Sequence, residues 1–96
     1  MYIHWSVQAL EDRVAIFDYI GIDSVTAASR LDDRIDDELE RLVRFPEMGR
    51  SGRVEGTREL VITRTPYIVA YTFTSEAVTI LRLLHGAQLW PEEMEQ

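Results

Sequence analysis

The 96-residue sequence contains no cysteine, no lysine and only two histidines. Without cysteine, disulfides, thiolate catalysis and cysteine-ligated zinc sites are excluded. No apolar run reaches the roughly 20 residues of a membrane span and no basic, hydrophobic leader opens the chain, so we expect a cytoplasmic protein without membrane association. Because no HExxH, Walker or GxGxxG pattern occurs and the histidines have no metal-binding spacing, we expect neither a metal nor a cofactor.

Charge is uneven along the chain. It carries 17 acidic residues against 10 arginines, for a net charge of −7. Residues 1–48 hold 11 of the acidic residues and five arginines, whereas residues 49–91 hold three and five. The protein as a whole therefore repels nucleic-acid phosphate at long range, while arginines of the second half could contact phosphate or carboxylate locally.

Two amphipathic helices are predicted in the first half. Ser6 is the expected N-cap of the first, and Gly21 its expected end. Ser24 can cap the second, which Phe45 and Pro46 stop. The first helix has apolar residues at helical spacing at Val7, Leu10, Val14, Phe17 and Ile20, and the second at Ala28, Leu31, Ile35, Leu39 and Leu42. The short link between them predicts an antiparallel helical hairpin.

Strand-like segments supply the rest of the predicted fold. A short strand is expected at residues 2–5, and three more at 58–64, 67–74 and 77–85, separated by tight turns. These predict an antiparallel meander with the first strand on its edge, while residues 46–57 form a flexible, glycine-containing loop. We expect one α+β domain over residues 1–96: a two-helix antiparallel hairpin packed on an antiparallel sheet of about four strands. The predicted core comprises Leu10, Val14, Phe17, Leu31, Ile35, Leu39, Leu60, Ile62, Tyr71 and Leu83.

Side chains alternate across a strand, so each predicted strand has a core face and an open face. Bulky residues of the 67–74 strand, such as Tyr71, are expected to meet the helices. The open face then consists of Glu59, Val61, Thr63, Ile68, Ala70 and Thr72. That face is small, mixed in character and not cationic.

The order of elements and several short motifs resemble toxins of the RelE/ParE superfamily of type II toxin–antitoxin systems, over nearly the whole chain. The motifs are Trp5 and residues 45–50, 56–60, 66–71 and 84–86. The resemblance implies a protein that arrests growth and is neutralised by a cognate antitoxin. It also implies that the toxin contacts DNA only indirectly, through the antitoxin. It leaves three possibilities: a ParE-like toxin that binds DNA gyrase, a RelE-like endonuclease that cuts messenger RNA on the ribosome, and a derived module that has lost its poisoning activity.

The nuclease possibility makes specific demands on the open face. Phosphodiester cleavage needs a base, an acid and cations that stabilise the developing charge. The resemblance places Ile68 where those nucleases carry arginine, and Glu59 and Val61 near their lysines. What remains is Glu59 as a base, Arg82 and His85 on the last strand, and Arg50, Arg53 and Arg58 around the loop. A regular strand points Arg82 and His85 to opposite faces, so a bulge would be needed to join them.

The same residues have ordinary structural interpretations. A lone histidine is more often structural than catalytic, and Arg82 within an apolar strand calls for an ion pair, with Glu59 as one candidate partner. These considerations favour the ParE-like interpretation, in which the toxin acts by binding a protein. The expected target-binding residues are Arg50, Arg53, Arg58, Gln88 and Trp90.

Overall fold

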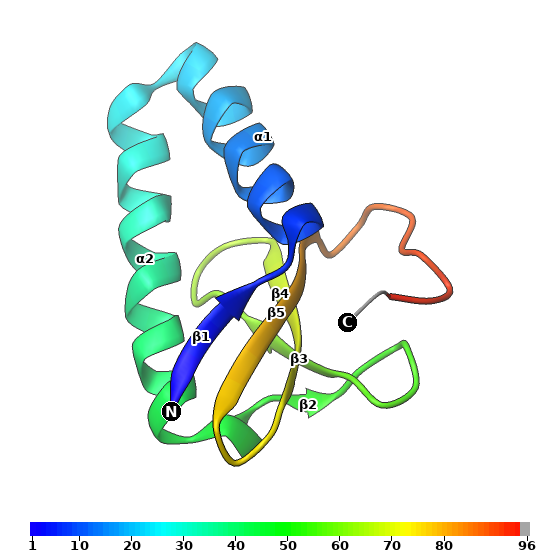
Figure 1. Cartoon of the computed structure of the whole chain (residues 1–96). Coiled ribbons are helices and arrows are strands. Elements are labelled where there is room, and N and C mark those ends of the chain that lie inside the picture. The colour runs from blue at the N-terminus through cyan, green and yellow to red at the C-terminus, as the bar shows by residue number, and fades with distance from the viewer. Residues whose placement is uncertain (95–96) are drawn as a thin grey trace.

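The computed structural model of the protein describes residues 1–94; Glu95 and Gln96, the end of the predicted domain, lie outside the described residues. One short strand precedes two helices, and the remaining strands follow (Figure 1). In chain order the elements are β1 (Tyr2–Trp5), α1 (Val7–Asp23), α2 (Val25–Arg44), a 3₁₀ turn η1 (Pro46–Met48), β2 (Arg50–Ser51), β3 (Arg58–Val61), β4 (Tyr67–Phe73) and β5 (Ala77–His85). Within residues 1–94, no helix is both long and apolar enough to cross a bilayer.

The strands form one five-stranded sheet in the order β1-β5-β4-β3-β2. The predicted meander of β3, β4 and β5 is confirmed, and so is the place of β1 on its edge. Three details differ from the prediction. The strand predicted at residues 58–64 ends at Val61. β1 runs parallel to β5, which is possible because the helical hairpin supplies the long crossover that parallel neighbours need. The segment predicted as a flexible loop contains η1 and a short strand, β2, paired with β3.

The helical hairpin is confirmed, with both predicted N-caps in place. The Ser6 side chain accepts a hydrogen bond from the Ala9 N–H, and the Ser24 side chain accepts one from the Ala27 N–H. The prediction that Gly21 ends α1 is wrong, because the helix continues to Asp23. Ser24 ends α1 and begins α2, since its backbone N–H donates to the Ile20 carbonyl while its hydroxyl caps the next helix.

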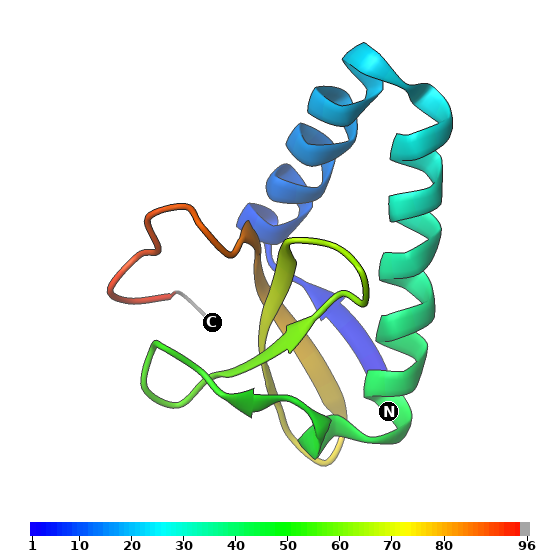
Figure 2. The same ribbon diagram turned by 180° about the vertical axis from the view of Figure 1, so that it is seen from behind.

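The apolar stripe of α2 is buried as predicted, along one face of the sheet (Figures 1 and 2). Ile35 is 1% exposed and Leu42 is fully buried. The sheet residues beneath them include Leu60, Ile62, Tyr71 and Leu83, which were predicted for the core. The buried apolar cluster consists of Ala9, Leu31, Ile35, Leu39, Leu42, Leu60, Ile62, Tyr67, Val69, Tyr71, Val78, Ile80 and Leu83.

The predicted apolar stripe of α1, in contrast, faces solvent over its first half, and of its five members only Ile20 packs against the core. Val14 is 60% exposed and Leu10 is 48% exposed, so both were wrong as core positions, and Phe17 is only partly buried. The face that packs inward carries Ala9 and Ile16, which were not predicted, together with Ile20, which was. Two polar contacts hold α1 in this rotation: Asp12 accepts a hydrogen bond from the Leu83 N–H of β5, and Arg13 binds carboxylates of α2.

Tyr71 ties the segment before β2 to the sheet. Its buried hydroxyl donates to the Pro46 carbonyl at 2.7 Å and accepts the Gly49 N–H at 2.9 Å. Burial raises the pKa of Tyr71 despite the lowering effects of the Gly49 hydrogen bond and of Arg58. A Cβ at Gly49 would lie 2.5 Å from the Tyr71 hydroxyl, so only glycine fits there. This contact sets where β2 and the β2–β3 loop begin.

Candidate functional site

The β2–β3 loop and the C-terminal segment after β5 lie on the side of the sheet away from α2 (Figures 1 and 2). This side was predicted to be open. Ile68 is 5% exposed and Ala70 is fully buried, so the prediction is wrong at these positions, while Val61 at 42% remains exposed. The C-terminal segment starts over this face, because a Cβ on Gly86 would lie 3.3 Å from the Ile68 side chain.

Two of the three candidate catalytic residues share one row across this face. In the sheet register Arg50 of β2 is opposite Glu59, Glu59 is opposite Ala70, and Ala70 is opposite Arg82. Neighbouring strands lie about 4.8 Å apart, so one intervening strand separates the Glu59 and Arg82 backbones by about 10 Å. The two side chains therefore have a common face but different immediate surroundings.

Glu59 anchors the β2–β3 loop. Glu59 is 2% exposed as a residue. Its carboxylate accepts hydrogen bonds from the Arg53 backbone N–H at 2.7 Å and from Arg50 Nη2 at 3.1 Å, and Arg53 Nε lies 3.6 Å away. Removing a carboxylate from water is costly unless it is paired and hydrogen-bonded, and these donors meet that need. The predicted general base is thus the acceptor around which the loop folds.

Arg82 forms the ion pair expected of it, but with a different partner. Its Nε and Nη2 bind the two carboxylate oxygens of Asp12 at 2.8 and 3.0 Å, so the suggested pairing with Glu59 is wrong. This bidentate bond raises the pKa of Arg82 in spite of partial burial. Asp12 was missed in the sequence because it looks like an ordinary solvated helix residue. Asp12 has this role only because α1 docks beside the part of β5 that extends beyond its pairing with β1.

His85 points to the opposite face of the sheet from Arg82. A bulge does interrupt the β4–β5 pairing, between the Ala70–Arg82 and Tyr71–Ile80 pairs. It precedes both residues in β5 and therefore cannot bring them together. The His85 ring packs edge-on against Tyr67 with centroids 5.5 Å apart, and its Nδ1 accepts the Ala87 N–H at 3.0 Å. These contacts shape the turn that leaves β5.

The β2–β3 loop and the C-terminal segment are joined by Arg53 and Trp90. The Arg53 guanidinium lies 4.0 Å from the Trp90 ring centroid and Arg53 Nη1 lies 3.5 Å from the Gly86 carbonyl oxygen. The indole N–H of Trp90 donates to the His85 carbonyl at 3.2 Å, and the Gln88 side chain accepts the His85 N–H at 2.8 Å. A cation–π contact of this kind stabilises by about 0.5–1 kcal/mol at an exposed site.

Four of the five predicted target-binding residues therefore cluster, and one does not. Arg50, Arg53, Gln88 and Trp90, together with the 96% exposed Leu89, form what we call the loop–tail surface. Arg58 lies outside it, because its Nη1 donates to the Glu47 and Gly49 carbonyls and its guanidinium lies 5.7 Å from the Phe73 ring centroid. Arg58 therefore holds the segment before β2 against the sheet.

The arrangement suits contact with another macromolecule better than proton transfer. Glu59 and Arg82 are each bound to other charged groups, and His85 is on the far face. Among residues 1–94, no three His, Asp or Glu side chains are grouped so that they could hold a metal ion. A hollow of about 310 Å³ beside Arg82 is lined by Gln8, Pro91, Glu93 and Met94.

Comparison with known sequences points to one family. The profile of the family described as the ParE toxin of the type II toxin–antitoxin system parDE matches residues 3–90. Y4kP of Sinorhizobium fredii, which is named as a toxin, is 39% identical over 90 residues, or 94% of this chain and 93% of its own. Toxin RelE2 of Caulobacter vibrioides is 39% identical over 85 residues, or 88% of this chain and 94% of its own.

A solved structure agrees with the sequence comparisons. It is described as the chromosomal ParDE system from P. aeruginosa, and one of its chains superposes with a TM-score of 0.78. The match has 25% sequence identity and covers 88% of this chain and 95% of that chain. The helical hairpin on a mostly antiparallel sheet is therefore the fold of that protein as well.

Proposed function

The chain belongs to the ParE toxin family of type II toxin–antitoxin systems, and from this premise we propose that it arrests growth by binding DNA gyrase. In this proposal the toxin acts as a protein ligand and cleaves no nucleic acid. A cognate antitoxin neutralises it, and the toxin meets DNA only through that antitoxin. The supercoiling activity of gyrase, and not translation, is then what fails in the poisoned cell.

The separation of the candidate nuclease residues carries this proposal. A ribonuclease must place a base, an acid and charge-stabilising groups around one phosphate. Here the carboxylate of Glu59 is buried under two arginines, Arg82 is bound to Asp12 on both oxygens, and His85 lies across the sheet. Nothing in that arrangement brings a proton donor and a proton acceptor to a common point.

The loop–tail surface is the proposed contact with the target. Arginine and tryptophan dominate the energetics of protein interfaces, and this surface presents two exposed arginines beside Trp90 and Leu89. The Arg53–Trp90 contact fixes the loop and the C-terminal segment relative to one another, which reduces the ordering that binding requires. The loop–tail surface also lies within residues 49–91, which hold five arginines and three acidic residues.

The second candidate is a ribosome-dependent messenger-RNA endonuclease. The name of the relative RelE2 favours it, and so does the common face of Glu59 and Arg82. Under this alternative the Arg82–Asp12 and Glu59–Arg50 pairs would have to open on the ribosome to release the catalytic groups. His85 would also have to cross to the other face.

Gyrase supercoiling and translation, measured separately with the purified toxin, test the proposal. We expect loss of supercoiling activity, intact ribosome-bound message, and inhibition that is lost when the chain is cut before Gly86. Replacing Arg53 and Trp90 together by alanine should weaken inhibition by at least about tenfold. Arg30→Ala removes the same charge from an exposed position on α2 and should leave inhibition unchanged.

His85→Ala separates the two candidates. Toxicity should persist in this variant if its thermal unfolding resembles that of the parent, because the ring contacts Tyr67 and the turn. Codon-position-specific cuts in translated message that disappear in His85→Ala would overturn the gyrase proposal and establish the nuclease. His85→Asn is the control, because asparagine retains a hydrogen-bond acceptor. If His85→Asn is toxic and His85→Ala is not, the loss in the alanine variant is structural.

A further inference from the structure

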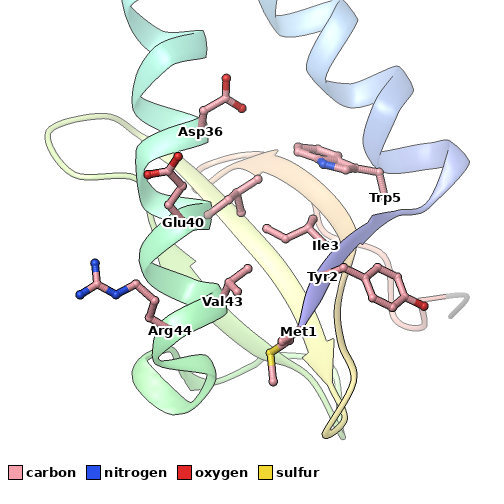
Figure 3. A pocket seen from close by; sticks show the side chains of 9 residues that line it. Met1, Tyr2, Ile3, Trp5, Asp36, Glu40, Val43 and Arg44 are labelled. Atoms are coloured by element: carbon pink, nitrogen blue, oxygen red, sulfur yellow. The ribbon is translucent and has the colours of Figure 1, made fainter.

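Two glutamates differ from the other acidic residues that the structure describes, because they are buried. Asp36 and Glu40 of α2 are exposed and border an open groove between α2 and β1 (Figure 3). Glu38 and Glu59, in contrast, are 7% and 2% exposed. A buried carboxylate is costly unless donors surround it, so its donors show what it holds in place. Glu38 accepts a hydrogen bond from Thr63 Oγ1 at 2.7 Å and so holds the turn after β3 against α2.

Glu59 holds Arg53 at two points. One carboxylate oxygen accepts the Arg53 backbone N–H at 2.7 Å, and the other lies 3.6 Å from Arg53 Nε. Next to this contact the loop is closed by a hydrogen bond from the Gly52 N–H to the Thr57 carbonyl, at 2.8 Å. A Cβ on Gly52 would lie 2.9 Å from the same carbonyl oxygen, so the closure depends on glycine. Both the backbone and the side chain of Arg53 are therefore restrained.

The Arg53 side chain carries this restraint to the C-terminal segment. Its guanidinium lies 4.0 Å from the Trp90 ring centroid, and its Nη1 lies 3.5 Å from the Gly86 carbonyl oxygen. An arginine in solvent samples many rotamers, and fixing it in one of them costs conformational entropy. A target that met an unrestrained Arg53 would have to supply that ordering from its own binding free energy. In this protein Glu59 supplies part of it in advance.

We infer that Glu59 is a positioning residue for target binding, which holds Arg53 against Trp90 so that the loop–tail surface is ordered before the target arrives. This inference rests on the proposed function, in which that surface contacts gyrase. Glu59 lies beneath the loop and is too buried to touch the target itself. Its influence on affinity must therefore pass through Arg53 and Trp90.

Glu59→Gln tests this role with little change of shape. Glutamine keeps an acceptor for the Arg53 N–H but lacks the charge that attracts Arg50 and Arg53. Both arginines are exposed and can return to water, so the fold should persist, as thermal unfolding will show. We expect inhibition of gyrase to weaken by about three- to tenfold. Glu38→Gln is the matched control, because it neutralises the other buried glutamate on the α2 side of the sheet and should leave inhibition unchanged.

A double-mutant cycle distinguishes positioning from a general loss of structure. If Glu59 acts through Trp90, Glu59→Gln should weaken inhibition in the wild-type background and add little in a Trp90→Ala background. Additive effects of the two substitutions would overturn the inference, because they would mean that Glu59 acts by another route.

The fluorescence of Trp90 provides a measurement that needs no target. The chain has two tryptophans, so Trp5→Phe leaves Trp90 as the only one. In this background Glu59→Gln should make Trp90 easier to quench with acrylamide, whereas Glu38→Gln should not. Unchanged quenching in Glu59→Gln would overturn the positioning role and leave the proposed function intact. Easier quenching without weaker inhibition would refute the link between order and target binding.

Failure of the proposed function has a different signature, since the wild-type toxin would then not inhibit supercoiling at all. The cycle between Glu59→Gln and Trp90→Ala would in that case be measured on growth arrest in induced cells. Non-additive effects there would support the positioning role, and additive effects would refute it. Cleavage of translated message that is lost in Glu59→Gln but retained in Trp90→Ala would make Glu59 a catalytic base and overturn the inference.

Discussion

The two helices of the hairpin carry similar apolar spacing but use it differently. In α2 the stripe at Leu31, Ile35 and Leu39 is buried, whereas in α1 the corresponding Leu10 and Val14 face solvent. The remaining faces explain the contrast. α2 has acidic residues and arginines around most of its circumference, so only one rotation buries apolar surface. In α1, Ala9 and Ile16 form a second apolar set that shares Ile20 with the predicted stripe, so either rotation buries apolar side chains.

Polar contacts choose between the two rotations of α1. Asp12 reaches the Leu83 N–H of β5, beyond the pairing with β1, and Arg13 reaches α2 in the rotation in which Ala9 and Ile16 face inward. The alternative rotation would leave the Leu83 N–H and Arg82 without the Asp12 carboxylate, at a cost of several kcal/mol. Where the apolar spacing of a helix allows two rotations, specific hydrogen bonds therefore decide which face is buried.

The largest expected effect compares equivalent deletions on the two helices. Ile35→Ala should lower the free energy of unfolding by about 2–5 kcal/mol, because it opens a cavity beneath a side chain that is 1% exposed. Val14→Ala on α1 should change it by less than about 0.5 kcal/mol. Chemical denaturation of both variants measures the difference. Losses of similar size would show that α1 rotates in solution and that its outer stripe is buried.

An intermediate effect is expected at Arg13, which joins the helices. Burial lowers the pKa of Arg13, but hydrogen bonds to Asp32 and Asp36 outweigh burial and leave the pKa raised. The guanidinium also lies 5.1 Å from the Trp5 ring centroid. Arg13→Met keeps the apolar stem and should lose about 1 kcal/mol of stability at low ionic strength. That difference should shrink in about 1 M salt; a loss independent of salt would assign the contribution to packing.

The smallest effect is expected at Gly21, where the structure contradicts the predicted end of α1. Gly21 is helical, and an added Cβ would lie 4.0 Å from the Ala28 side chain, which is an ordinary contact. Gly21→Ala should therefore raise the free energy of unfolding by about 0.5–1 kcal/mol. Thermal unfolding followed by circular dichroism suffices to measure this. A destabilised variant would mean that the hairpin needs a more flexible position there.

Much of the fold could be predicted because local chemistry specifies it. Ser6 and Ser24 cap their helices as expected, and the strong amphipathicity of α2 allows one orientation only. Tight turns between the last three strands leave no arrangement except a meander. The family resemblance further predicted that the hairpin packs on the sheet, and the profile match agrees with that family.

Less of the candidate site could be predicted, because it depends on which distant residues meet. Strand alternation correctly placed Arg82 and His85 on opposite faces, and the need of Arg82 for a carboxylate was also correct. Which carboxylate pairs with Arg82 could not be predicted from the sequence. Glu59 and Asp12 are equally plausible partners of Arg82 in the sequence. Only the register of β2 with β3 shows that Glu59 pairs with Arg50 and Arg53.

The sequence by itself determined the type and order of the elements, the burial of α2 and the character of the chain as a member of a toxin family, since these depend on neighbours within a few residues or on motifs. The tertiary structure alone decided the rotation of α1, the partners of Glu59 and Arg82, and the free edge of β1 beside its groove. The physical reason is that an ion pair or a strand edge is satisfied by whatever group the fold brings within hydrogen-bonding distance, and that group can be 70 residues away, as Asp12 is from Arg82.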